Sequence, residues 1–122
     1  MPRVPARTVG RITRRAAFAE LQRSRARGAS GPVRVTFVPA DVGDAGVFPQ
    51  VAYAIGRHCG NAVVRNSLRR RAREVVRAEA PTLPRGAYLL RLEPAAAAAD
   101  PAVFRHDVAK ALVKAGRGRV AA

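Results

Sequence analysis

Alternation of hydrophobic and polar positions predicts two half-buried strands, and a third, almost wholly apolar run is typical of a central strand. Three further segments place apolar residues three or four positions apart, which indicates amphipathic helices. In chain order the predicted elements are helix 13–27, strand 33–38, strand 50–56, helix 61–79, strand 87–92 and helix 101–114. This α-β-β-α-β-α order predicts an α+β fold, a two-layer α/β sandwich in which helices cover one small central sheet.

Turn-forming and capping residues set the ends of these elements. Residues 28–32 contain two glycines and a proline and are interpreted as a breaker. Residues 39–46 are typical of a turn, and we expect them to join the first two strands as a hairpin. Asn61 is placed to cap the long helix, which Pro81 ends, and Asp100 is placed to cap the last helix.

The 122 residues fit one domain. Residues 1–10 carry two prolines, one glycine and two arginines without periodicity, which predicts a flexible basic arm. Residues 116–122 are predicted to be a disordered tail, so the single folded α+β domain is expected to span residues 11–115. The five alanines at 95–99 fit a linker or a helix equally well.

Charge adds a feature that the hydrophobic pattern does not show. Basic residues number 23 and acidic residues 8, which gives a formal net charge of +15. Such an excess attracts polyanions and favours a nucleic acid over a membrane surface or an acidic protein as the partner. Only two of the basic residues are lysines. Arginine binds phosphate through a planar fork of donors, but the excess of arginine over lysine also fits the codon bias of a GC-rich genome, and both explanations of that ratio stay open. Codon bias cannot explain the net charge.

Three classes of protein do not fit this composition. The longest apolar stretch, residues 94–99, is far too short to span a bilayer, so we expect no membrane partner. No apolar run follows the basic N-terminal segment, so we expect no secretory signal and a cytoplasmic location. Cys59 is the single cysteine, which excludes an intrachain disulfide and a zinc site built from cysteines.

The arginine-rich segment 57–77 carries the strongest indication of function, with seven arginines and the single acid Glu74. On a helix at about 100° per residue, one arc is apolar and is predicted to pack on the sheet: Val64, Leu68, Ala72, Val75 and Val76. The adjacent arc holds no acid, and we call it the arginine stripe: Arg65, Asn66, Arg69, Arg70, Arg73 and Arg77. Solvated helix faces usually mix acids and bases, so the stripe predicts an anionic partner, with a merely solvated face as the alternative.

A short signature lies inside this segment. Residues 57–70 contain a basic pair, then GNAV, Arg-Asn and Arg-Arg. This run resembles the signature of the bacterial ribonuclease P protein subunit. The order of elements is similar to that family over nearly the whole chain. Three positions depart from its pattern. Ser67 replaces an arginine, which puts one phosphate contact in doubt. His58 replaces a permanently charged residue. Cys59 replaces a β-branched residue and is interpreted as a small buried apolar side chain.

The resemblance implies the protein subunit of a ribonucleoprotein endonuclease and hydrolase that processes tRNA. In that family the catalytic groups belong to a large RNA, which uses bound Mg²⁺ to remove the 5′ leader of precursor tRNA and leave the mature 5′ end. The expected partners are therefore the ribonuclease P catalytic RNA and the 5′ leader of precursor tRNA. We expect Mg²⁺ to be bound mainly by the partner RNA, no metal site or catalytic group on this chain, and a protein that is itself monomeric.

The resemblance also implies site residues. Those expected to bind RNA are Arg57, His58, Asn61, Arg65, Asn66, Arg69, Arg70 and Arg73. Those expected to line a cleft for the leader, between the first helix and the sheet, are Phe18, Phe37 and Tyr53, where bases can stack. Core packing stays the alternative for all three aromatic residues. The family further implies a left-handed βαβ crossover, against the usual right-handed rule.

Two other classes of function stay open. A structural ribosomal protein or other small basic RNA-binding protein would share the size, the charge and the lack of disulfides. A DNA-binding regulator would insert the arginine helix into a major groove, but it needs a tight helix-turn-helix, whereas the predicted helix lies between two strands.

Overall fold

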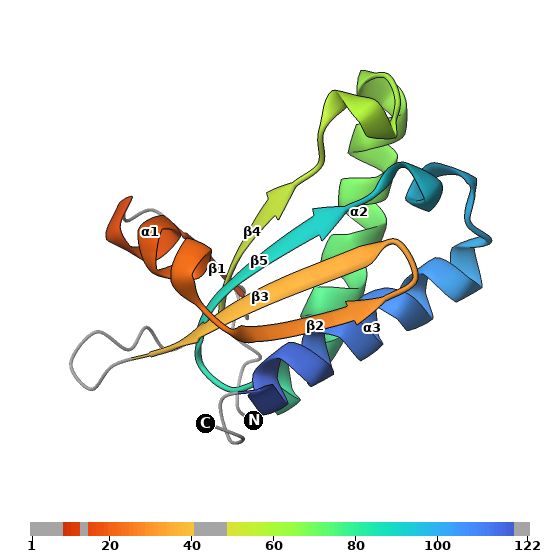
Figure 1. Ribbon diagram of the computed structural model, residues 1–122. Coiled ribbons are helices and arrows are strands. Elements are labelled where there is room, and N and C mark those ends of the chain that lie inside the picture. The colour runs from red at the N-terminus through yellow and green to blue at the C-terminus, as the bar shows by residue number, and fades with distance from the viewer. Residues whose placement is uncertain (1–8, 13–14, 41–48, 119–122) are drawn as a thin grey trace, which may run out of the picture.

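The computed structural model describes residues 9–12, 15–40 and 49–118, which form a five-stranded sheet with helices on both faces (Figure 1). The strands are β1 Gly10–Arg11, β2 Ala26–Ser30, β3 Val33–Pro39, β4 Gln50–Ala54 and β5 Gly86–Leu92. The α-helices are α1 Arg15–Arg23, α2 Ala62–Glu79 and α3 Pro101–Gly118. Short 3₁₀ turns lie between them: η1 Arg57–Cys59, η2 Ala80–Thr82 and η3 Pro94–Ala98. The predicted α+β class is confirmed.

The sheet order is β1-β4-β5-β3-β2, so β5 is the central strand, as its apolar sequence predicted. β5 runs antiparallel to β3 and parallel to β4, and α2 makes the crossover between β4 and β5. The predicted hairpin between the strands at 33–38 and 50–56 is therefore wrong, because β5 lies between them. The central position in the sheet buries most of β5, and Arg91 is the one exposed residue of this strand. The left-handed sense of the crossover stays a prediction.

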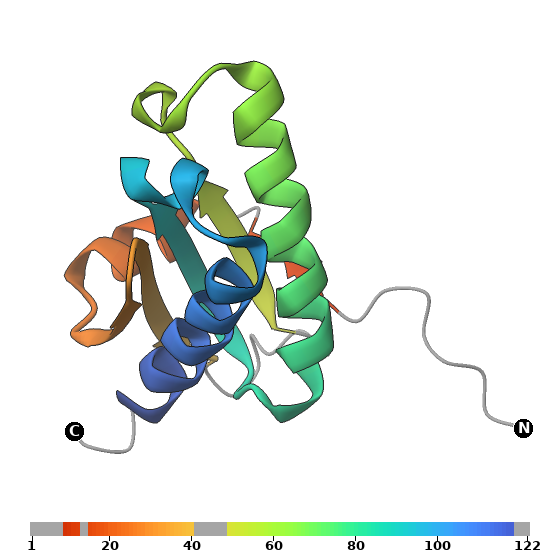
Figure 2. The ribbon, with the colours of Figure 1, turned by 90° about the vertical axis from the view of Figure 1, so that its right-hand side faces the viewer.

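The three helices divide between the two faces of the sheet (Figures 1 and 2). α2 and α3 lie side by side on one face, and the core between them and the sheet is built from fully buried side chains such as Phe37, Tyr88, Leu90 and Phe104. α1 lies across the opposite face against β3 and β5, where its Leu21 is buried. This arrangement leaves part of the α1 face of the sheet uncovered.

Strand β2 was not predicted, because its sequence was interpreted as the end of the first helix followed by a breaker. α1 ends at Arg23, and Ala26–Ser30 pairs with β3 from Ala26↔Phe37 to Ser30↔Val33. A Cβ at Gly28 would lie 2.2 Å from the carbonyl oxygen of Ala111, so glycine lets α3 pack directly on this strand. Gly31, at φ +53°, makes the turn into β3. Pairing and close packing define β2, and neither is visible in local sequence.

The ends of the domain also differ from prediction. Asp100 caps α3 as expected, since its Oδ1 accepts a hydrogen bond from the N–H of Ala102 at 2.9 Å. The helix continues to Gly118, with Gly116 buried, so the tail predicted from residue 116 begins inside α3. Gly10 belongs to β1 and pairs with Gln50, so it is part of the sheet and not of an arm. Outside the described residues lie residues 1–8 of the predicted arm, the predicted start of the first helix at residues 13–14, most of the 39–46 loop and residues 119–122.

Candidate nucleic-acid interface

Gly60 and Asn61 of the signature precede α2 and set where it begins. The side-chain Oδ1 of Asn61 accepts a hydrogen bond from the backbone N–H of Val64 at 3.0 Å, which caps the helix. Gly60 has φ +137°, and a Cβ there would lie 2.9 Å from Cγ1 of Val64. Both residues therefore have a structural role. The cap uses Oδ1 of Asn61, so the predicted RNA contact of this residue would have to use its side-chain NH₂ group.

Replacing Asn61 with alanine is expected to remove this cap and lower the free energy of unfolding by about 1 kcal/mol. Urea unfolding followed by circular dichroism measures the change. Asn61→Asp is the matched control, because aspartate also caps helices and should keep the stability near that of the parent protein. Equal stability of the alanine variant and the parent would contradict the role as a cap.

The two arcs predicted for α2 are separate in the structure. Leu68, Ala72, Val75 and Val76 are buried in the core, and Val64 packs against it. On the arginine stripe, four side chains are exposed: Asn66, Arg70, Arg73 and Arg77. The other two, Arg65 and Arg69, are partly buried. The stripe is thus displayed on the surface while the opposite arc anchors the helix.

Neighbouring contacts hold parts of the stripe in place. Arg69 Nη1 donates a hydrogen bond to Asn66 Oδ1 at 2.9 Å. The guanidinium carbon of Arg73 lies 5.6 Å from the centre of the Tyr53 ring, within cation–π range. Burial raises the pKa of Tyr53 to about 12, against the opposing effect of Arg73 and Arg77, so its phenol stays neutral at ordinary pH. These contacts order the stripe without removing its charge.

No carboxylate neutralises the stripe within the described residues. The ion pairs found there join Arg34 to Glu93 and Arg105 to Glu74, and neither includes a stripe side chain. Like charges this close on one helix repel each other, so an anionic partner would relieve an unfavourable interaction. The charge pattern that predicted such a partner is therefore present on the folded surface.

The basic pair before the stripe lies on η1. Arg57 and His58 are both exposed there, whereas Cys59 is buried and its Sγ–H donates to the carbonyl oxygen of Leu92 at 3.4 Å. Burial raises the pKa of the Cys59 thiol, with the charge of Arg65 opposing the shift, which fits the interpretation as a small buried apolar side chain. Nε of Arg65 is buried and has no hydrogen-bond partner.

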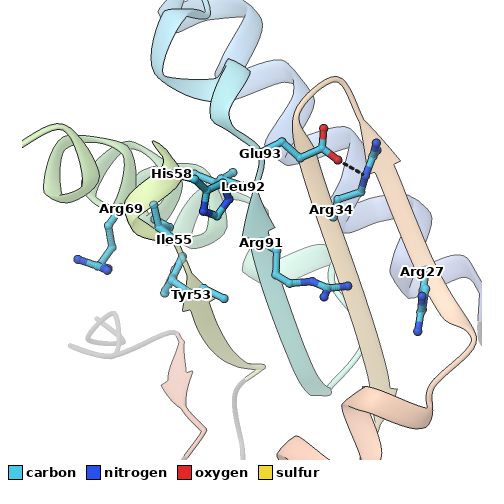
Figure 3. Close-up of a pocket in the computed structure, with 11 residues that line it drawn as sticks. Arg27, Arg34, Tyr53, Ile55, His58, Arg69, Arg91, Leu92 and Glu93 are labelled. Carbon is cyan, nitrogen blue, oxygen red and sulfur yellow. Dashed lines mark hydrogen bonds and ion pairs between the residues drawn. The ribbon is translucent and has the colours of Figure 1, made fainter. Parts of the chain in front are cut away.

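A pocket of about 880 Å³ adjoins the stripe, and we call it the sheet pocket (Figure 3). Its basic lining comes from β2, β3, β5, η1 and α2: Arg27, Arg34, Arg91, His58 and Arg69. Arg34 and Arg91 are register partners, and both alternate with buried residues that face α2 and α3, so they point to the face that carries α1. Arg69 belongs to both the stripe and the pocket, so the two form one basic surface.

The aromatic residues predicted for the leader cleft lie in three different environments. Phe18 on α1 is 39 % exposed, and Tyr53 lines the sheet pocket. Phe37 is fully buried, with its ring stacked on Tyr88 at a centroid distance of 4.5 Å, so its assignment to a cleft is wrong. Phe37 has the same alternation phase as Val35, which places it on the core side of β3.

Three arginines of the pocket were not among the residues predicted from the sequence: Arg27, Arg34 and Arg91. Arg34 and Arg91 stand at polar positions of two predicted strands, which was a usable signal. It went unused because β5 was not placed beside β3. Arg27 was assigned to the first helix, so its place on a strand could not be seen.

A metal site or a membrane-spanning helix would each indicate a different class of protein. In the part of the chain that the structure describes, no three histidine, cysteine, aspartate or glutamate side chains lie together as a metal site would need. None of the described helices has the length and apolar character to cross a membrane.

Together, the fold and these surfaces define a small α+β domain with a cationic helix face joined to a basic pocket on its sheet. The chain matches the family model "Ribonuclease P" over residues 7–116, and it therefore belongs to that family. The predicted family is confirmed.

Curated relatives and solved structures agree with this assignment. The Ribonuclease P protein component of Acidothermus cellulolyticus is 47 % identical over 53 residues, which are 43 % of this chain and 44 % of that protein. The Ribonuclease P protein component of Nocardioides sp. is 37 % identical over 68 residues, or 55 % and 58 % of the two chains. The chain thus spans about half the length of the curated relatives it matches.

The RNase P protein from Staphylococcus aureus superposes with a TM-score of 0.69 at 15 % identity, covering 93 % of this chain and 94 % of that one. The RNase P protein from Thermotoga maritima gives a TM-score of 0.61 at 19 % identity, covering 80 % and 90 %. At these identities the likeness shows a shared fold.

Proposed function

We propose that this chain is the protein subunit of ribonuclease P, and that it binds the catalytic RNA and the 5′ leader of precursor tRNA during removal of that leader. The observation that carries the proposal is the continuous basic surface made by the arginine stripe and the sheet pocket, on a member of the Ribonuclease P family. The proposed RNA contacts are those expected from the signature, extended by the pocket arginines Arg27 and Arg91.

The proposed mechanism is charge neutralisation together with positioning. The stripe would replace counterions where catalytic RNA and substrate approach each other, which lowers the repulsion between two polyanions. The sheet pocket would hold unpaired leader nucleotides by contacts to their backbone, and Phe18 and Tyr53 offer rings for stacking. Magnesium, held mainly by the partner RNA, would supply the metal chemistry of hydrolysis. No group of this chain takes part in bond cleavage in this proposal.

Reconstitution tests the proposal directly. The purified chain is added to the cognate catalytic RNA and a precursor tRNA at low magnesium, and cleavage at the mature 5′ end is followed on a gel. Cleavage that needs the protein supports the proposed function. A small ribosomal protein would leave cleavage unchanged and would sediment with ribosomal subunits, and that result would refute the proposal.

The affinity for RNA should depend strongly on salt. If about five phosphates are neutralised, raising the salt concentration fourfold should weaken binding roughly 100-fold, from a slope of about −0.7 per contact. Fluorescence anisotropy with labelled precursor tRNA measures this slope. An affinity that does not change with salt would remove the electrostatic basis of the mechanism.

A further inference from the structure

The charged lining of the sheet pocket contains one carboxylate among several arginines. Arg27, Arg34, Arg69 and Arg91 line it together with Glu93 (Figure 3). Glu93 Oε1 accepts a hydrogen bond from Arg34 Nε at 3.1 Å, and both side chains are about half exposed, at 50 % and 45 %. An acid placed here repels the phosphates that the arginines attract, so its presence in a pocket for RNA needs an explanation.

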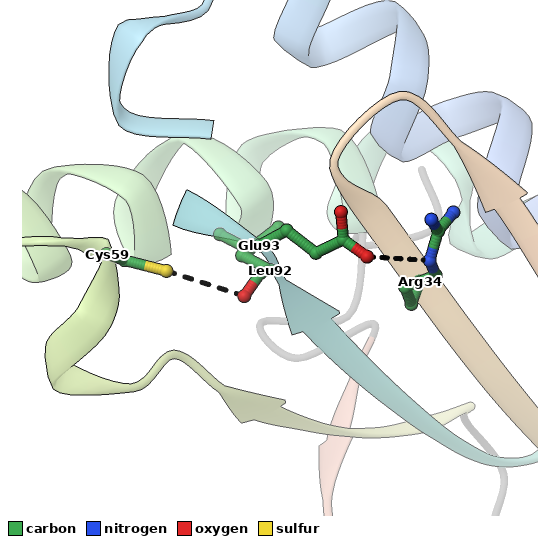
Figure 4. A network of polar contacts seen from close by, with 4 residues as sticks. All are labelled: Arg34, Cys59, Leu92 and Glu93. Atoms are coloured by element: carbon green, nitrogen blue, oxygen red, sulfur yellow. Dashed lines mark hydrogen bonds and ion pairs between the residues drawn. The ribbon is translucent and has the colours of Figure 1, made fainter. Parts of the chain in front are cut away.

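The position of Glu93 is fixed by the fold. It follows the last residue of β5, and its backbone N–H donates to the carbonyl oxygen of Pro32 at 2.9 Å. Arg34 stands opposite Arg91 in the β3–β5 register, and Glu93 lies two residues beyond Arg91, so all three side chains line the same pocket (Figure 3). Figure 4 shows the Glu93 side chain reaching across to Arg34.

The pocket arginines differ in how free they are to meet a phosphate. Arg91 makes no hydrogen bond or ion pair within the described residues. Arg27 uses only Nε, which donates to the carbonyl oxygen of Ser24 at 3.1 Å, so both terminal nitrogens stay available. Arg34 is partly neutralised by Glu93. A strand crossing the pocket would therefore place its phosphates at Arg27 and Arg91 and another group at Glu93.

The chemistry of a carboxylate restricts what that group can be. An ionised carboxylate only accepts hydrogen bonds, and the donors of single-stranded RNA are the ribose 2′-hydroxyl and base N–H groups. We infer that Glu93 is a specificity-determining residue of the sheet pocket: its carboxylate accepts a hydrogen bond from a ribose 2′-hydroxyl or a base amino group and keeps phosphate away from Arg34. The inference rests on the proposed function, because it takes single-stranded RNA as the occupant of the pocket.

Binding of short unpaired oligonucleotides to the Glu93→Gln variant tests the inference. Fluorescence anisotropy compares an RNA with a DNA of the same sequence, and a cytidine-only RNA with a uridine-only RNA, which lacks a base amino group. The parent protein is expected to favour RNA over DNA, or cytidine over uridine, by about fivefold. Glu93→Gln should bind every strand more tightly and lose that preference.

Glu74→Gln is the matched control, because it removes the same charge from the other described glutamate–arginine pair. Glu74 Oε2 lies 3.5 Å from Arg105 Nη2, with both side chains 53 % exposed, and it is absent from the pocket lining. This variant should keep the parent's preferences. Thermal unfolding of both variants checks that the fold is intact.

The outcomes separate the sources of the hydrogen bond. A fall in the RNA-to-DNA ratio for Glu93→Gln alone supports a ribose contact, and a fall in the cytidine-to-uridine ratio supports a base contact. Unchanged ratios, even with tighter binding, would overturn the inference while leaving the proposed function standing. If the parent protein bound none of the strands, or bound them with an affinity that does not change with salt, that result would instead overturn the proposed function itself.

Discussion

Replacing Arg69 and Arg73 together with alanine is expected to weaken RNA binding about tenfold at 0.15 M salt and to make the salt slope shallower by about 1.4, which is two contacts at about 0.7 each. Both side chains belong to the arginine stripe, and Arg69 also lines the sheet pocket. The same variant should need more magnesium for cleavage in the reconstituted enzyme, because free cations must replace the lost positive charges. Anisotropy titrations at several salt concentrations measure the first effect.

The control for this variant removes two positive charges from another helix. Lys110 and Arg117 are exposed on α3 and belong neither to the stripe nor to the pocket. Their double alanine variant should change the affinity far less than the stripe variant does. Equal losses from the two helices would mean that net charge, and not the stripe, governs binding.

Replacing Phe37 with alanine is expected to lower the free energy of unfolding by about 3–5 kcal/mol and the melting temperature by roughly 10–20 °C. The ring is fully buried and stacks on Tyr88, so its removal leaves a cavity at the centre of the core. Differential scanning calorimetry measures the change. Because the variant is destabilised, its RNA binding carries no information on a cleft.

Phe18→Ala is the comparison, since this ring is partly exposed on α1 and its loss should change stability by less than about 0.5 kcal/mol. If Phe18 stacks on leader bases, the affinity for single-stranded RNA should fall while the melting temperature holds. A large loss of stability here and none for Phe37→Ala would reverse the assignments made from burial.

Sequence predicts those features of this fold that local geometry determines. Periodicity placed the apolar arc and the arginine stripe of α2 correctly, because a helix alternates its faces by local geometry alone. The signature predicted the family, and the apolar character of β5 predicted its central position. The alternation of β3 also favours the core for Phe37, since its phase matches Val35, whereas the family resemblance implied a position in the cleft.

What sequence could not supply depends on contacts between distant segments. β2 exists because it pairs with β3 and because Gly28 admits the backbone of α3, and no local propensity reports either fact. The sheet pocket depends on the order β4-β5-β3-β2, which brings Arg27, Arg34 and Arg91 from three separate strands onto one surface. Without that order the arginines could be recognised only as scattered polar positions.

The central place of β5 has a consequence for synthesis of the chain. β3 and β4 precede it in sequence but pair with it and not with each other, so their inner edges have no partner until residue 92 has left the ribosome. Pairings that wait for a distant segment are slow to form. The nascent chain therefore passes through a stage in which two unpaired strand edges and an arginine-rich helix are exposed together. A chaperone or a nearby RNA would meet the protein first in that half-assembled state.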